Sequence, residues 1–225
     1  MKFTPPTAKL LINTALAFFC ATVLNVQAQM GMEASDLKLS NEEELRLRNI
    51  VEAPVDLTSM NLKLIQVYKE KELAAFLLKD RKANEQILRE WLKISGDDVT
   101  PKAKLRDLLW SIGEREESIK FGEECIAQAR WPNQKISSRV SLAYLYLQER
   151  DLTKVKELIN KSGEILKNEL PSQSRVGSNV FWITQAELIY YMLKSELESV
   201  EGKWAQAIES SKVAALKSND ILKFT

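Results

Sequence analysis

The sequence contains no histidine, and that absence excludes several kinds of functional site. Histidine is the commonest general base and a usual zinc ligand, and it completes Ser-His and Cys-His nucleophile pairs. Glycine is also scarce, with 7 in 225 residues, and no glycine-rich phosphate-binding loop occurs. Carboxylates cluster, as in "EREE", where a solvated helix face would place them. The sequence therefore predicts a protein that is not an enzyme and that has no cofactor site and no metal site.

Cysteine is nearly absent too, since the chain has only Cys20 and Cys125. Cys20 lies in an apolar segment near the amino end, so a processed chain would keep one thiol. A lone thiol cannot form an internal disulfide, and an exported protein of this kind must be stabilised by packing alone. Because Cys125 lies in a helical pattern, we expect it to be a small buried residue.

The amino end has the pattern of a secretory signal peptide. Lys2 and Lys9 precede the uncharged run "LLINTALAFFCATVL", and Val26 and Ala28 suit the small-residue positions before a cleavage site. The sequence predicts a signal peptide over residues 1–28, cleavage after Ala28, and a periplasmic or otherwise exported protein. The alternative is an uncleaved membrane anchor, for which the polar residues of this segment are unfavourable.

The charge of the processed chain would be close to zero. Removal of the signal would leave 30 basic and 31 acidic residues, a net charge of −1. A near-neutral chain with well-mixed charges has no electrostatic reason to bind nucleic acid or an anionic membrane. Nucleic acid is therefore not an expected partner.

The rest of the chain divides into a leader and a helical domain. Residues 29–60 are predicted to be a leader with a short helix, because Ser40 and Glu43 have capping-box spacing and Pro54 ends the pattern. Over residues 61–225 apolar residues recur at spacings of three and four, as in amphipathic helices. The breaks between these runs are short, which makes neighbouring helices antiparallel hairpins.

Each break has a physical cause. Thr100 is expected to cap a helix with Pro101 in its first turn, and Gly113 is expected to close that helix. Pro132 ends the next helical run, because proline cannot donate to the helical ladder. Asp151 is expected to cap the helix that follows.

The turn residues Gly113, Arg150 and Gly202 are 37 and 52 residues apart. Over about residues 100–218 the chain resembles the tetratricopeptide repeat, a helix-turn-helix unit of about 34 residues. The last unit matches the family pattern at Gly202, Trp204, Ala207, Ile208 and Ala214. The middle unit matches at Leu142, Ala143, Tyr146 and Leu152, with Val155 and Ser162 where alanine is usual. The first unit matches at Leu105, Gly113, Ser118, Ile119 and Cys125, with Arg115 in place of the aromatic residue.

This resemblance implies an all-α fold, an α-solenoid of about four antiparallel helix hairpins. Small residues at Ala207 and Ala214 would let paired helices approach closely, and Trp204 would cover the hairpin end. In such solenoids the first helices line a concave surface, and the implied function is the binding of a peptide or protein segment there. The residues expected to face that surface are Asp107, Trp110, Tyr144, Gln148, Met192 and Glu196, with Trp182 on a neighbouring turn.

The chain departs from the family in one respect that concerns the ligand. Chaperone-binding members hold a peptide carboxylate with Lys and Asn side chains on the first helices. The corresponding positions here are Ala103 and Asp107, Val140 and Tyr144, and Met192 and Glu196. That clamp is missing, so the carboxyl-terminal tail of a chaperone is not an expected ligand.

Several alternatives stay open. One is the amino-terminal sensor or interaction region of a larger signalling protein, truncated after the last repeat, because no convincing polar capping helix follows that repeat. Another is a helical enzyme using carboxylates alone, which would need two converging carboxylates, one with a raised pKa. A membrane-surface helix over residues 61–82 and homo-oligomerisation through an apolar edge of the last repeat are two more.

Overall fold

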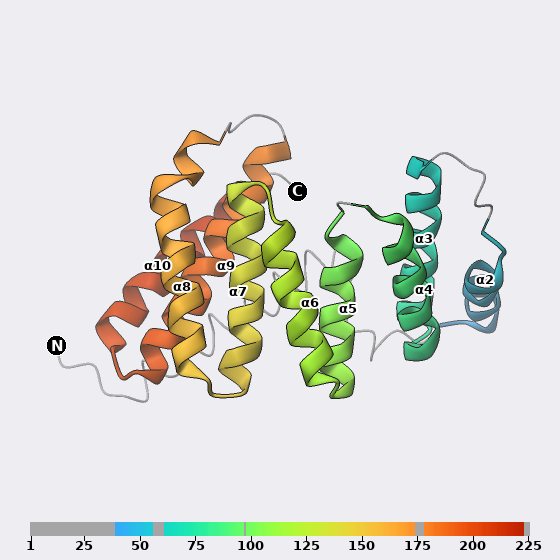
Figure 1. Ribbon diagram of the computed structural model, residues 1–225, viewed down its shortest axis with the longest axis horizontal. Helices are drawn as coiled ribbons and strands as arrows, with labels where there is room; N and C mark the ends of the chain where they lie inside the picture. Colours follow the sequence, from blue (N-terminus) through green and yellow to red (C-terminus); the bar gives the residue numbers. More distant parts are fainter. Residues whose placement is uncertain (1–38, 56–60, 97, 174–177, 223–225) are drawn as a thin grey trace. The chain divides into compact units, whose positions relative to one another are not determined.

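The computed structural model describes residues 39–55, 61–96, 98–173 and 178–222 (Figure 1). The predicted signal peptide and its cleavage site lie outside the described residues. The chain divides into two compact units, an amino-terminal unit that ends at Gln128 and a carboxy-terminal unit that begins at Ala129.

The described residues form helices joined by turns and contain no strand, so the predicted all-α fold is confirmed. The amino-terminal unit contains α2 (Asn41–Glu52), α3 (Asn61–Leu77), α4 (Arg81–Ile94), α5 (Thr100–Ile112) and α6 (Arg115–Gln128). The carboxy-terminal unit contains α7 (Pro132–Gln148), α8 (Leu152–Asn168), the 3-10 helix η1 (Leu170–Ser172), α9 (Ser178–Val200) and α10 (Trp204–Ile221). From α3 onward, helices pack in neighbouring pairs: α3 with α4, α5 with α6, α7 with α8 and α9 with α10.

Two of the predicted helix starts are confirmed in atomic detail. The Ser40 hydroxyl accepts from the Glu43 amide at 3.2 Å, and the Glu43 carboxylate accepts from the Ser40 amide at 2.8 Å. This reciprocal capping box satisfies two amides that the helix itself leaves unbonded. At the start of α8, Asp151 Oδ1 accepts from the Lys154 amide at 3.1 Å. Both caps come from residues within three positions of the helix start, which is why the sequence alone reveals them.

The start of α5 differs from the prediction. Thr100 is the first helical residue and not the cap, and Val99 precedes it without a side-chain cap. The amide and the hydroxyl of Thr100 donate to Asp98 Oδ1 at 2.9 and 2.5 Å. The Asp98 carboxylate therefore supports the positive end of the helix in place of a threonine cap. The predictions that Pro101 lies in the first turn and that Gly113 closes the helix are confirmed.

Turns of one geometry connect the two helices in each of these four pairs. One residue in each turn has a positive φ: Lys79 (56°), Gly113 (90°), Arg150 (61°) and Gly202 (75°). The amide of the next residue donates to the carbonyl five positions back, an arrangement that satisfies the last carbonyls of the first helix. A residue other than glycine holds this conformation at a cost of about 1–2 kcal/mol. No glycine marks the turns at Lys79 and Arg150, so the positive φ of these two residues does not follow from the residue type.

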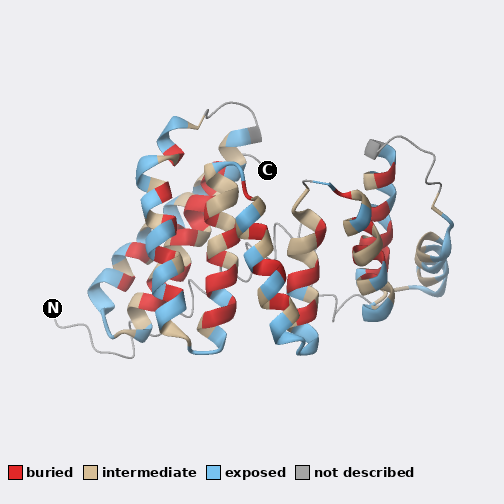
Figure 2. Ribbon diagram, viewed as in Figure 1, coloured by how far each residue is buried: buried red, intermediate tan, exposed pale blue. Residues whose placement is uncertain are grey.

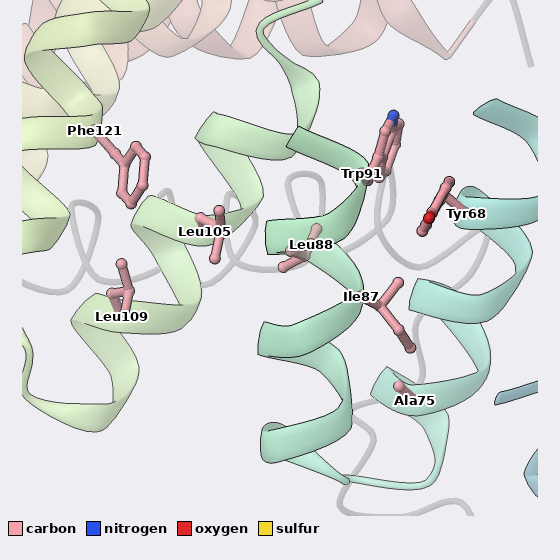
Figure 3. Packing of buried hydrophobic residues seen from close by; sticks show 8 residues of the cluster. All are labelled: Tyr68, Ala75, Ile87, Leu88, Trp91, Leu105, Leu109 and Phe121. Atoms are coloured by element: carbon pink, nitrogen blue, oxygen red, sulfur yellow. The ribbon is translucent and has the colours of Figure 1, made fainter. Parts of the chain in front are cut away.

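A hydrophobic cluster runs through the amino-terminal unit from α3 to α6 (Figure 3). Its buried members are Tyr68, Ala75, Ile87, Leu88, Trp91, Leu105, Leu109 and Phe121. Ile87 and Trp91 point from α4 toward α3, whereas Leu88 lies on the side of α4 that faces Leu105 of α5 (Figure 3). Because α4 packs apolar side chains against two neighbours, it forms the centre of this unit.

Ion pairs join helices of this unit that do not follow one another in the chain. Arg89 of α4 donates to both carboxylate oxygens of Glu117 on α6, at 3.0 and 2.9 Å. Lys104 of α5 and Glu72 of α3 are paired at 2.7 Å. Such partly exposed pairs contribute little energy, about 0–1 kcal/mol each. The buried side of each helix therefore supplies most of the stabilisation, and α2, which has no buried residue, is bound more weakly (Figure 2).

The positions at which the repeat resemblance predicted small residues are buried on α6, α8 and α10. They are Ser118 and Cys125 on α6, Val155 and Ser162 on α8, and Ala207 and Ala214 on α10. The Ser195 hydroxyl of α9 donates to the Ala207 carbonyl of α10 at 2.8 Å, which requires a close approach of the two helices. Burial also raises the pKa of the Cys125 thiol, as expected for a packed residue.

In the carboxy-terminal unit, α9 packs against α7, α8 and α10. A close contact on its α8 side involves Gly163, because a Cβ atom there would lie 2.7 Å from Tyr190 Oη. The start of α7 is tied to the segment after α8, since Gln173 Nε2 donates to Asn133 Oδ1 at 3.0 Å. The long helix α9 is therefore the central element of this unit.

Candidate functional site

The turn geometry places three of the predicted site residues at equivalent positions of their helices. Each lies six residues before the positive-φ residue that follows its helix: Asp107 in α5, Tyr144 in α7 and Glu196 in α9. Asp107 lies in the amino-terminal unit, whereas Tyr144 and Glu196 lie in the carboxy-terminal unit on helices that pack against each other. The candidate site is therefore built on α7 and α9.

On α7 one side of the helix is packed against the rest of the unit, and the predicted site residues lie on the other side. Val140 and Ala143 are buried, whereas Tyr144 is 41% exposed and Gln148 is exposed. Residues four apart lie on one face of a helix, so the tyrosine and the glutamine form one outward patch. The Tyr144 ring offers apolar area with few rotatable bonds and a hydroxyl that can both donate and accept.

On α9 the two predicted residues have different surroundings. Met192 packs against the buried cluster formed by Leu188, Ala214 and Ile221, so its side chain contributes to the contact between α9 and α10. Glu196 is half-buried, and no side chain of the described residues forms an ion pair with it. Burial raises the pKa of the Glu196 carboxyl, because the charged form loses solvation. Glu196 is thus a carboxylate that would gain from a cationic partner.

The raised pKa of Glu196 predicts a pH-dependent stability. The folded state holds this proton more tightly than the unfolded state, so its contribution to stability is present at low pH and is lost as the pH rises through the folded pKa. Glu196→Gln should therefore increase the free energy of unfolding at pH 7, and the gain should vanish below about pH 4, where the unfolded carboxyl is protonated. Urea unfolding of both proteins at pH 3.5 and pH 7 would measure this. An equal difference at both pH values would contradict the predicted pKa.

In the amino-terminal unit the two predicted residues interact with their own helix pair. The Asp107 carboxylate accepts from the buried Arg106 guanidinium at 2.7 Å and is itself exposed. The Arg115 guanidinium stacks over the Trp110 ring at 3.8 Å from its centroid, which joins the end of α5 to the start of α6. Such stacking is worth about 0.5–1 kcal/mol at an exposed site. Trp110 thus acts at least as a packing residue.

Exposed tryptophan is a feature of the carboxy-terminal unit that the sequence predicts only in part. Trp131, Trp182 and Trp204 are 60%, 50% and 41% exposed, whereas Trp91 of the other unit is fully buried. The sequence offers Trp182 as a further candidate for the partner-binding surface. The Phe181 ring lies edge-on against it, with the two ring centroids 5.0 Å apart. Trp204, expected from the sequence to cover a hairpin end, is the first residue of α10, directly after the turn at Gly202. Trp131 directly precedes α7 and Trp204 is the first residue of α10, whereas Trp182 lies one turn into α9.

Comparison with known proteins adds no assignment. No protein-family model, no curated protein and no solved structure matches the chain. Within the described ranges, no group of three or more acidic or cysteine side chains is arranged to hold a metal ion. No helix of that part of the chain is long and apolar enough to cross a membrane.

Proposed function

We propose that this protein is an exported, non-catalytic binding module of the tetratricopeptide type, in which hairpins stack as a solenoid and a protein or peptide segment docks on α7 and α9. The observation that carries the proposal is Tyr144, a large aromatic side chain that is 41% exposed at a position where the helix could as well carry a small polar residue. Tyrosine and tryptophan dominate the binding energy of protein interfaces. Their exposure here favours a partner that buries them.

The arrangement of the helix pairs supports the repeat part of this proposal. Four pairs are closed by turns of one geometry, and the positive-φ residues of these turns are 34, 37 and 52 residues apart. The longest spacing includes η1 and the segment before α9. Each second helix from α6 onward has buried small residues seven positions apart, as repeat packing requires. Stacked units of this kind present their first helices on one surface.

The charges on α7 and α9 suggest what the partner offers. Glu196 is a half-buried carboxylate without an ion-pair partner among the described residues, so a lysine or arginine of the partner would recover its lost solvation. Tyr144 and Gln148 lie on one face of α7 and supply an aromatic anchor beside a polar group. We therefore expect a partner segment that carries an apolar residue and a basic residue. The proposal that the protein is exported is based on the amino-terminal sequence pattern. We therefore expect the partner segment to belong to an envelope protein.

Site-specific photo-crosslinking in the cells that make the protein tests this function. A photoreactive amino acid placed at position 144 or at position 196 should crosslink to the same partner, because both positions face one docked segment. Lys161 on α8 and Lys212 on α10 provide matched controls, since their side chains are 55% and 64% exposed and belong to the second helices. These control positions should give no crosslink to that partner. Crosslinks of equal yield from all four positions, or none from 144 and 196, would rule out the proposed face.

A further inference from the structure

A second candidate site lies in the amino-terminal unit and is independent of the proposed partner face. A cavity of about 680 Å³ is bounded by the last residues of α2 and the segment up to Val55, by Tyr68 and Lys71 of α3, and by residues of α4 between Ala83 and Ile94. Ligand pockets in proteins commonly have volumes of about 300–1,000 Å³. The cavity is therefore large enough for a small organic molecule.

Lys71 is the unusual residue of this cavity. It is only 7% exposed, and its ammonium donates to the Val51 carbonyl at 2.6 Å, near the carboxyl end of α2. A lysine ammonium has three N–H donors, so this bond uses one of them. No carboxylate of the described residues lies within ion-pair distance of Lys71, although Glu72 beside it is paired with Lys104. Burial lowers the pKa of Lys71, because the charged form loses solvation, and the Glu90 carboxylate on α4 opposes that shift.

The remaining lining shows what kind of molecule could accept the remaining hydrogen bonds of the Lys71 ammonium. The apolar part of the wall comes from two sides, from Val51, Ala53, Pro54 and Val55 on one and from Ile87 and Ile94 on the other. Glu90 also lines it, and its carboxylate is engaged by Gln86 Nε2 at 3.0 Å. Glu52 and Lys93 are the other charged lining residues and carry opposite charges. A fitting ligand would thus combine one anionic group, placed at Lys71, with an apolar body.

We propose that this cavity binds a small amphipathic carboxylate, whose carboxylate oxygens accept hydrogen bonds from the Lys71 ammonium and whose hydrocarbon part packs between α4 and the segment that follows α2. The bound ligand would bridge the end of α2 to α3 and α4. It would thereby hold in place a helix that buries no residue of its own. The ligand would be stabilised by a charge-assisted hydrogen bond in a desolvated site, where such bonds are strong.

Calorimetric titration of the full chain with straight-chain monocarboxylates from butanoate to decanoate tests this site, with the primary alcohol and the primary amine of equal length as probes of the charge. At least one carboxylate should bind, and the matched alcohol and amine should bind at least about tenfold more weakly. Lys71→Met keeps the hydrocarbon stem and should weaken carboxylate binding by about tenfold or more. Lys69→Met is the matched control, because Lys69 is exposed on the same helix as Lys71 and does not line the cavity, and it should change the affinity less than about twofold.

Two further measurements keep the result interpretable if Lys71→Met loosens α2. Ala83→Leu fills part of the cavity without altering Lys71, and it should also weaken binding. In the wild type, the ¹³Cε resonance of Lys71 should shift on titration while that of Lys69, which does not line the cavity, stays in place. The proposal is overturned if no carboxylate of the series binds, if chloride or the alcohol competes equally, or if neither variant weakens binding. Tyr144→Ala should leave carboxylate binding unchanged, so failure of this site and failure of the partner face are distinguishable.

Discussion

Replacement of Leu105 by alanine is expected to lower the free energy of unfolding by about 2–5 kcal/mol. Leu105 is fully buried on α5, in the cluster that Leu88 of α4 and Phe121 of α6 also form (Figure 3). The loss combines the missing transfer free energy of the side chain with the cavity left between helices that can only partly close. Urea denaturation followed by far-ultraviolet circular dichroism measures the change.

Leu45→Ala is the matched control for this experiment. Leu45 is the same residue type in the same unit, but it is 61% exposed on α2. Its removal should change the free energy of unfolding by less than about 0.5 kcal/mol. If both variants lost similar stability, the cluster from α3 to α6 would not be the core of this unit.

Gly163→Ala is expected to destabilise the protein by about 1–3 kcal/mol, opposite to the usual effect of this change. Inside a helix, alanine normally gains about 0.5–1 kcal/mol over glycine. At Gly163 the added Cβ would meet Tyr190 Oη at 2.7 Å, a distance that forces α8 and α9 apart or displaces the ring. The overpacking therefore outweighs the helix propensity. Thermal and denaturant unfolding of the variant would show the loss.

A double-mutant cycle with Tyr190→Phe isolates the contact. Without the hydroxyl, the nearest ring atoms to the new Cβ lie at 3.4 and 3.7 Å, which is ordinary van der Waals contact. In the Tyr190→Phe background, Gly163→Ala should thus be neutral or stabilising, and the two substitutions should be strongly non-additive. Equal destabilisation in both backgrounds would show that the hydroxyl is not what excludes a side chain at Gly163.

Local sequence signals predicted much of the helical framework. The capping box at Ser40, the cap at Asp151 and the turn glycines at Gly113 and Gly202 each act within a few residues, and each has the predicted role. Pro132 was expected to end a helix, but α6 already ends at Gln128 and Pro132 is the first residue of α7. Features decided by contacts distant in the chain were missed. The turn at Lys79 holds a disfavoured conformation because the packing of α3 on α4 outweighs a local cost.

The same reasoning explains what sequence reading could not find at the candidate sites. Lys71 lies among charged residues in "YKEKEL" and looks like part of a solvated face. It is buried because the end of α2, 20 residues earlier, lies over it and accepts its hydrogen bond. The position of Tyr144 is predictable, because it follows from its spacing of six residues before the turn at Arg150. Met192 lies ten residues before the turn at Gly202, as Val140 lies ten residues before the turn at Arg150. In the structure Met192 packs against the buried residues between α9 and α10.

The affinity of the purified chain for its crosslinked partner, compared between the wild type and Tyr144→Ala, tests the proposed function most directly. Tyr144 is expected to be an energetic anchor, and its truncation should weaken binding by about tenfold or more, with circular dichroism unchanged. Leu216→Ala, which removes a side chain 64% exposed on α10, should bind like the wild type. Equal affinities of the wild type and Tyr144→Ala would contradict a binding face on α7 and α9.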